Sequence, residues 1–121
     1  MADGLTEQII GAAIEVHREL GPGLLESIYE EALCHELALR NVPFRRQVEV
    51  VVRYKNTAIA GQRVDLLVGE TVVVELKSQR NLPDVVAAQV LSYLKAAGLK
   101  RGLLINFGEQ RLVDGVRRFS L

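Results

Sequence analysis

The sequence predicts an α/β domain in which a mixed sheet of about five strands is flanked by three helices. Segments with helical and strand-like hydrophobic periodicity follow one another in the order helix, helix, three strands, helix, two strands. The third helix separates the third and fourth strands, and a helical crossover of this kind joins parallel strands. The sheet is therefore expected to be mixed, with the helices covering it.

The first forty residues predict two helices. Residues 6–20 (TEQIIGAAIEVHREL) carry apolar side chains at every third or fourth position, and Thr6 is a candidate cap near the start. The GPG run at Gly21–Gly23 ends this helix. Residues 24–40 (LLESIYEEALCHELALR) repeat the pattern and end before the NVP run at Asn41–Pro43. Each helix is expected to place its apolar face against the sheet.

The rest of the chain predicts five strands and one helix. The strands are FRRQVEVVVRY (44–54) and TAIAGQRVDLLV (57–68) around a Lys55–Asn56 turn, TVVVELK (71–77) after the Gly69 turn, GLLINF (102–107) and RLVDGVRRFSL (111–121). GLLINF is apolar almost throughout, as in a fully buried strand. LPDVVAAQVLSYLKAAG (82–98) predicts the third helix, because a proline stands near its start and a glycine just past its end.

Composition limits the function classes. The 121 residues are 49% hydrophobic, which predicts one domain spanning residues 1–121. The formal net charge is zero, which argues against a strong non-specific nucleic-acid binder but not against a local basic groove. Cys34 is the single cysteine, so an internal disulfide or a cysteine metal cluster is excluded. No apolar run reaches the roughly 18 residues of a membrane span and no signal sequence is present, so a soluble, cytoplasmic protein is expected.

The stretch VDLLVGETVVVELKS places charged side chains within two apolar strands. Asp65 lies on the first strand, while Glu75 and Lys77 share a face of the second. Carboxylates on adjacent strands can hold Mg²⁺ or Mn²⁺, which activates a water against a phosphodiester, and a nearby lysine can stabilise the developing charge. Spacing alone favours a simpler alternative, in which these side chains reach solvent or pair with one another.

The turn between these two strands decides whether they can share a site. A two-residue loop, Gly69-Glu70, would place Asp65 opposite Val74 and on the face away from Glu75. A three-residue loop ending at Thr71 would place Asp65 opposite Glu75. A shared metal site therefore predicts the longer loop or a bulge that shifts the register by one residue.

Other polar residues interrupt apolar helix faces. Gln89 and Tyr93 are four apart on the third predicted helix and can hydrogen-bond phosphate or water, although a partly buried helix flank explains them equally simply. Glu26 and Tyr29 are three apart near the start of the second helix, where Glu26 complements the helix dipole and could add a metal ligand. For His17, a hydrogen-bonded core histidine is favoured over a phosphate contact.

The run GLLESIY at residues 23–29 matches the motif of the GxxExxY proteins, a group similar to the PD-(D/E)XK nuclease superfamily. The resemblance extends over VHRELGPGLLESIYEEAL, VDLLVGETVVVELKS and QVLSYLKAAGLKRGLLINFG. It implies a restriction-endonuclease-like core of order ααβββαββ. The sequence departs from the family pattern at 85–88 (VVAA), where family members often have a histidine shortly before the glutamine.

The resemblance also implies roles for particular residues. Asp65, Glu75 and Lys77 would form the metal and catalytic core, and Glu26 would be an acidic partner. Independently of the resemblance, the Leu76 carbonyl is a candidate for a further metal ligand. Gln89 and Tyr93 would be the QxxxY pair of exonuclease-like branches. The further candidates for substrate or phosphate contact are Tyr29, His17, Arg45, Arg46, Arg53, Arg63 and Arg80.

The sequence therefore predicts a Mg²⁺- or Mn²⁺-dependent nuclease acting on DNA phosphodiester bonds. An exonuclease-type activity and a homodimer are both compatible with this prediction. Two alternatives remain open. The fold could bind nucleic acid without cleaving it, or it could be a structural, dimerising domain whose charged cluster is an internal salt-bridge network.

Overall fold

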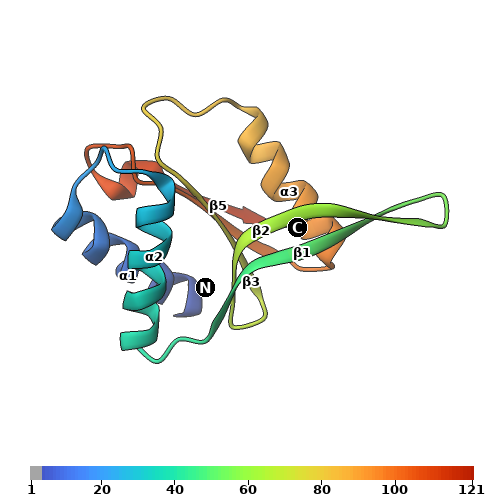
Figure 1. Ribbon diagram of the computed structural model, residues 1–121, viewed down its shortest axis with the longest axis horizontal. Coiled ribbons are helices and arrows are strands. Elements are labelled where there is room, and N and C mark those ends of the chain that lie inside the picture. Colours follow the sequence, from blue (N-terminus) through green and yellow to red (C-terminus); the bar gives the residue numbers. More distant parts are fainter. Residues whose placement is uncertain (1–3) are drawn as a thin grey trace.

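The computed structural model describes residues 4–121, and their element order confirms the sequence prediction (Figure 1). The elements are α1 (Gly4–Leu20), α2 (Glu26–Leu39), β1 (Phe44–Tyr54), β2 (Thr57–Val68), β3 (Val72–Lys77), α3 (Val85–Ala97), β4 (Arg101–Asn106), the short 3-10 helix η1 (Leu112–Gly115) and β5 (Val116–Ser120).

The five strands form one mixed sheet in the order β1-β2-β3-β4-β5. The pair β3–β4, which α3 connects, is parallel, and the other three pairs are antiparallel. This confirms the expected crossover. The crossover brings the end of β3 at Lys77 beside Asn106 at the end of β4. Polar side chains at the end of β3 therefore lie at the edge from which the loops to α3 and β5 leave the sheet.

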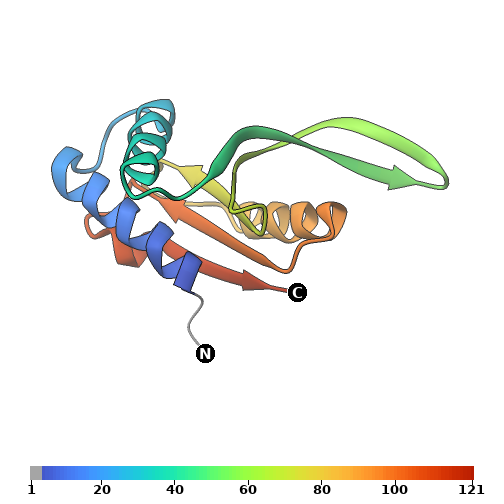
Figure 2. The same ribbon diagram turned by 90° about the horizontal axis from the view of Figure 1, so that it is seen from below.

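Helices cover both faces of the sheet, α1 and α2 on one face and α3 on the other (Figures 1 and 2). Alternation along β3 follows this division. Val72, Val74 and Leu76 join the core cluster of α1 and α2, whereas Val73 joins the cluster of α3. Because β3 is buried on both faces, Glu75 enters an apolar strand with little access to water.

Two local predictions need correction. Helix α1 already includes Gly4, so Thr6 lies inside the first turn instead of capping it. The last predicted strand is shorter than expected, because Leu112–Gly115 form η1 and only Val116–Ser120 pair with β4. The Cα of Gly115 faces the Asn106 carbonyl so closely that a Cβ there would lie 2.3 Å from that oxygen. The chain therefore bends close against β4 before the final strand begins.

The outer half of the β1–β2 hairpin projects from the body as a two-stranded ribbon (Figure 2). All of residues 51–63 are exposed. At the tip, Lys55 and Asn56 have φ values of 46° and 70° between the paired Tyr54 and Thr57. Two successive positive φ values define a type I′ turn, whose twist suits a hairpin. The predicted Lys55–Asn56 turn is therefore confirmed.

Candidate functional site

The turn between β2 and β3 is the longer of the two alternatives. Val68 pairs with Val72, so the loop is Gly69-Glu70-Thr71. The same register pairs Leu66 with Val74, which brings the next residues, Asp65 and Glu75, level with each other. The structure therefore confirms the register that a shared site requires.

The backbone ladder between β2 and β3 ends at the Leu66–Val74 pair. At the next residues, Asp65 and Glu75, side-chain carboxylates accept the hydrogen bonds between the two strands. The Asp65 N–H donates to Glu75 Oε1 at 3.1 Å, and the Leu76 N–H donates to Asp65 Oδ2 at 2.8 Å. Each carboxylate thus accepts a hydrogen bond from the other strand. The two strands separate here, and both carboxylates lie in the gap between them.

Burial and mutual repulsion oppose ionisation of these carboxylates. Glu75 is only 5% exposed, and burial, followed by the negative charge of Asp65, raises the pKa of Glu75 to about 8. Burial also raises the pKa of Asp65, although the Leu76 N–H and the Gln47 amide oppose the rise. Without a cation, Glu75 therefore holds a proton at neutral pH, whereas a bound cation would favour its ionised form.

Lys77 lies two residues beyond Glu75 on the same face of β3. Its positive charge opposes the pKa rise of Glu75 and Asp65, and likewise that of Glu26. The Lys77 carbonyl accepts the Phe107 N–H at 2.8 Å, so this carbonyl points toward β4. The carbonyl of the preceding residue, Leu76, therefore points toward β2, to the same side as the Leu76 N–H that Asp65 accepts.

These oxygens match the ligand preferences of a hard divalent cation. The Asp65 and Glu75 carboxylates and the Leu76 carbonyl all face the gap between β2 and β3, and Mg²⁺ and Mn²⁺ prefer oxygen ligands. Within residues 4–121, however, no three His, Cys, Asp or Glu side chains are grouped closely enough to hold a metal ion. The donor set therefore fits a cation through two carboxylates, and Glu26 is not grouped with them as a third.

Glu26 is the first residue of α2 and faces the same region. Burial raises the pKa of Glu26, Asp65 and Glu30 contribute to the rise, and Lys77 opposes it. These influences place Glu26 within electrostatic range of the two strand carboxylates. The structure therefore brings the predicted acidic partner to the site from the helix layer, without placing it among direct ligands.

Helix α3, which covers the sheet face opposite α1 and α2, contributes Tyr93 to the site. Tyr93 is 8% exposed, and its pKa is raised by burial and then by the charges of Glu75 and Asp65. Its phenol is therefore protonated at neutral pH and can donate a hydrogen bond near the carboxylates. Gln89 lies one turn earlier on α3 and is exposed. The predicted QxxxY pair thus spans from the edge of the site to solvent.

Two predicted substrate contacts are buried and hold the fold together. Tyr29 is fully buried, stacks on Phe107 with ring centroids 4.4 Å apart, and donates its hydroxyl hydrogen to the Gly21 carbonyl. The same hydroxyl accepts the Leu24 N–H at 3.2 Å. Tyr29 thereby fixes the loop before α2 and, one turn away, the position of Glu26. This gives a structural reason for the three-residue spacing of Glu26 and Tyr29.

His17 is the second of these buried residues. It is 8% exposed and its Nε2 lies 2.8 Å from the Glu109 carbonyl oxygen. Its ring also stacks beside Phe107, with centroids 6.3 Å apart. These contacts match the hydrogen-bonded core histidine that the sequence favours.

The candidate arginines fall into two groups. Arg45 pairs with Glu70, and Arg46 pairs with Glu30 and Glu31, so both are already neutralised. Arg53, Arg63 and Arg80 are exposed, and none has an ion pair within residues 4–121. Arg80 lines a hollow of about 560 Å³ together with Gly23, Ser78 and Gly108, just beyond the end of β3.

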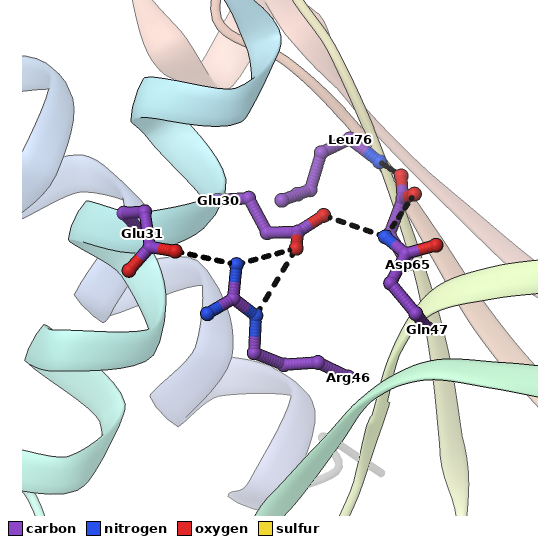
Figure 3. A network of polar contacts seen from close by, with 6 residues as sticks. All are labelled: Glu30, Glu31, Arg46, Gln47, Asp65 and Leu76. Atoms are coloured by element: carbon purple, nitrogen blue, oxygen red, sulfur yellow. Dashed lines mark hydrogen bonds and ion pairs between the residues drawn. The ribbon is translucent and has the colours of Figure 1, made fainter.

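Sequence reasoning missed two residues that contact the site, Glu30 and Gln47, and it predicted a phosphate contact for Arg46, which instead pairs with Glu30 (Figure 3). The Gln47 amide donates to Asp65 Oδ1 at 3.3 Å and to Glu30 Oε1 at 2.9 Å. Arg46 donates to the other oxygen of Glu30, with Nη2 at 2.8 Å. The sequence signal is the polar run RRQ at the start of β1, and it does not identify Asp65 as the partner of Gln47.

Comparison with known proteins identifies the family. A family model described as "PD-(D/E)XK nuclease superfamily" matches residues 3–119. The chain belongs to the PD-(D/E)XK nuclease superfamily. Its helices and mixed sheet have the PD-(D/E)XK arrangement. Membership supports a nuclease-like function in general, and PD-(D/E)XK nucleases generally use divalent metal ions.

Other comparisons add little to this PD-(D/E)XK assignment. One solved structure, described as "Crystal structure of SSO0001", is similar with a TM-score of 0.47 and 17% sequence identity. The match covers 98% of this chain and 78% of that one. No curated protein matches the chain. In the described part of this PD-(D/E)XK protein, no helix has the length and apolar character needed to cross a membrane.

Proposed function

We propose that this PD-(D/E)XK domain is a metal-dependent nuclease that hydrolyses DNA phosphodiester bonds. The observation that carries the proposal is the gap between β2 and β3, where Asp65 and Glu75 face each other and hydrogen-bond across the strands. Burial and the charge of Asp65 raise the pKa of Glu75 to about 8, and a bound cation would favour the ionised form of both carboxylates. Metal binding is therefore the simplest purpose for this arrangement.

Asp65, Glu75 and the Leu76 carbonyl would hold Mg²⁺ or Mn²⁺. When bound, the ion would neutralise the carboxylates and lower the pKa of a water for attack on phosphorus. Lys77 shares the face of Glu75, and its ammonium would orient the attacking water or stabilise negative charge on the phosphate oxygens. Glu26 would act from α2 as a further acidic group that favours the cation.

Residues of α3 would position the nucleic acid. The protonated Tyr93 phenol lies near the carboxylates and can donate a hydrogen bond to a phosphate oxygen. Gln89, exposed one turn earlier, would contact the next part of the strand. This QxxxY arrangement supports an exonuclease-type activity.

Cationic side chains lie on both sides of the proposed cleavage site. Arg80 lines the hollow beyond the end of β3. On the other side, a groove of about 1080 Å³ lies between α3 and the β1–β2 ribbon, and its lining includes Arg53, Lys95 and Val64, the residue before Asp65. Phosphate contacts of this kind position a nucleic acid without reading its sequence. The neutral net charge is therefore compatible with local nucleic-acid binding.

The second candidate function is nucleic-acid binding without cleavage. It is favoured by the small donor set, since residues 4–121 contain no group of three His, Cys, Asp or Glu side chains that could hold a metal ion. Two measurements on the purified chain separate the candidates. Millimolar Mn²⁺ is expected to raise the melting temperature of the wild-type protein, because a ligand that binds only the folded state stabilises it. The rise is expected to vanish in Asp65→Asn and to persist in Asp114→Ala, an exposed aspartate in η1.

Cleavage of an end-labelled DNA then decides between the two candidates. Metal-dependent release of short products from an end supports the exonuclease proposal. DNA binding without cleavage by a protein that binds Mn²⁺ would refute the nuclease and support the binding module. No metal-induced rise in melting temperature would refute the metal site itself.

A further inference from the structure

The strand next to the proposed site contains a non-glycine residue in the left-handed region. Gln47 lies within β1 with a φ of 50°. Its neighbours Arg46 and Val48 remain paired with β2, so the strand register continues on both sides of it. Non-glycine residues rarely adopt this conformation, and when they do the surrounding structure must hold them there.

Strand β2 is also irregular opposite Gln47. Val64 and Leu66 are two residues apart and would share a face in a regular strand. Instead, Val64 packs in the cluster beneath α3 and Leu66 in the cluster beneath α1 and α2. The residue between them is Asp65. Both strands thus depart from regular geometry at the row that contains Gln47 and Asp65.

The side chain of Gln47 uses this geometry to join two carboxylates. Its Nε2 group lies 2.9 Å from Glu30 Oε1 and 3.3 Å from Asp65 Oδ1 (Figure 3). Because both neighbours are acceptors, the amide nitrogen must face them, and the flipped amide would set an oxygen against two carboxylates. The amide therefore has one favourable orientation.

Glu30 is itself held in place by an arginine. Arg46 donates to Glu30 Oε2 from Nε at 3.1 Å and from Nη2 at 2.8 Å, and Nη2 also lies 2.8 Å from Glu31 Oε1. The Glu30 side chain is only 12% exposed. A chain of contacts thus runs from α2 through Arg46, Glu30 and Gln47 to Asp65.

The far end of the chain is fixed as well, because Asp65 Oδ2 accepts the Leu76 N–H at 2.8 Å. With Gln47 on Oδ1, both oxygens of Asp65 are held, and the carboxylate has one orientation in the gap. We propose that Gln47, braced by the Arg46–Glu30 pair, is a positioning residue that orients Asp65 for the divalent cation. This inference rests on the proposed function, and residues that orient metal ligands typically contribute about 10- to 100-fold to metal affinity.

Gln47→Asn tests the proposal without disturbing the backbone. Asparagine tolerates the left-handed region better than glutamine and keeps the amide, but it is one methylene too short to bridge Glu30 and Asp65. The expected result is unchanged or higher thermal stability together with at least about tenfold weaker Mn²⁺ affinity, measured by electron paramagnetic resonance of free Mn²⁺. Unchanged Mn²⁺ affinity would overturn the proposal.

The chain offers a matched pair of arginines as a control. Arg45 and Arg46 are adjacent in β1, and each binds a carboxylate through two nitrogens, but the partner of Arg45 is the exposed Glu70. Arg46→Lys is expected to weaken Mn²⁺ binding several-fold, and Arg45→Lys to leave it unchanged. Equal effects of the two substitutions on Mn²⁺ affinity would contradict the proposal that Arg46 acts on Asp65 through Glu30 and Gln47.

A metal-free measurement separates this inference from the proposed function. Hydrogen exchange of the Leu76 amide is expected to accelerate in Gln47→Asn, because a less ordered Asp65 protects that amide less well, while core amides such as Val74 keep their rates. Unchanged Leu76 exchange would overturn the positioning role. If the Leu76 amide exchanges faster in Gln47→Asn but the wild-type protein binds no Mn²⁺, the proposed metal site is refuted and Gln47 remains a residue that orients Asp65.

Discussion

The two ends of the β2–β3 hairpin are built differently. At the turn end, three successive residue pairs form a regular ladder, from Val68–Val72 to Leu66–Val74, and all six side chains are buried. At the other end, the Asp65 and Glu75 carboxylates replace backbone acceptors, and the strands separate. The turn end stabilises the fold through apolar burial. The open end, at Asp65 and Glu75, has fewer backbone hydrogen bonds between the strands and brings two carboxylates together. The same pair of strands thus supplies both the scaffold and the proposed site.

The largest expected effect of a single substitution lies at the open end. Lys77→Ala is expected to lower the rate of metal-dependent cleavage by roughly 10²–10³-fold, the usual effect of removing one group that stabilises transition-state charge. Mn²⁺ affinity should stay the same or rise, because a positive charge is removed from the site. Single-turnover cleavage and Mn²⁺ titration measure the two quantities, and Lys100→Ala, an exposed lysine before β4, is the control. Unfolding of Lys77→Ala would instead favour an internal salt-bridge network.

At the turn end, a substitution is expected to lower stability and to leave the metal site intact. Leu66 is fully buried and pairs with Val74, so Leu66→Ala is expected to lower the free energy of unfolding by about 3 kcal/mol through lost burial and a cavity. Once the protein is folded at low temperature, Mn²⁺ affinity should change little. Urea denaturation and Mn²⁺ titration at 10–15 °C, roughly the temperature of maximum stability for many domains, test this pair of expectations. A large loss of metal affinity in the folded variant would show that the two ends are not separable.

Glu75 lies where the two ends of the hairpin meet, and its effect on the free energy of unfolding depends on pH. In the metal-free protein its pKa of about 8 lies above that of the unfolded chain, so between these values the folded state binds more protons. The contribution of this proton uptake to the free energy of unfolding should therefore be fully present below about pH 4.5 and should be lost as the pH rises toward 8. Glu75→Gln removes the ionisation and keeps the oxygen that accepts the Asp65 N–H.

The Glu75→Gln variant is expected to be more stable than the wild type by up to about 4 kcal/mol at pH 8, with a smaller difference near pH 5. Urea denaturation in buffer containing a chelator measures the difference across this range. Parallel stability curves for the two proteins would contradict a raised pKa at Glu75. Addition of Mn²⁺ should reverse the order at pH 8, because only the wild type retains both carboxylates.

Much of this molecule could be predicted from local pattern. The hydrophobic periodicity of the helices, the Lys55–Asn56 turn and the apolar run of β4 each depend on a few neighbouring residues, and the structure confirms them. The parallel pairing of β3 and β4 also follows from the helix between them. Asp65, Glu75 and Lys77 could be selected as candidates because charge is costly within apolar strands.

Other features depend on distances across the fold. Tyr29 is chemically suited to bind substrate, but its hydroxyl is buried against Gly21 and Leu24, which only the loop geometry reveals. Pattern alone left two registers for β2 and β3, and only the structure shows that the loop runs from Gly69 to Thr71. A shift of one residue would have moved Asp65 to the other face.

The sequence by itself determined which elements form, in what order, and which charged residues stand out within buried strands. Only the tertiary structure decided that Asp65 and Glu75 converge and that Gln47 joins Asp65 to Glu30. Seventeen residues separate Glu30 from Gln47, and eighteen separate Gln47 from Asp65. Periodicity reports which face of its own element a residue occupies, but it carries no information about which side chain of another element lies opposite. That contact is set by the packing of α2 against the sheet and by the left-handed backbone at Gln47.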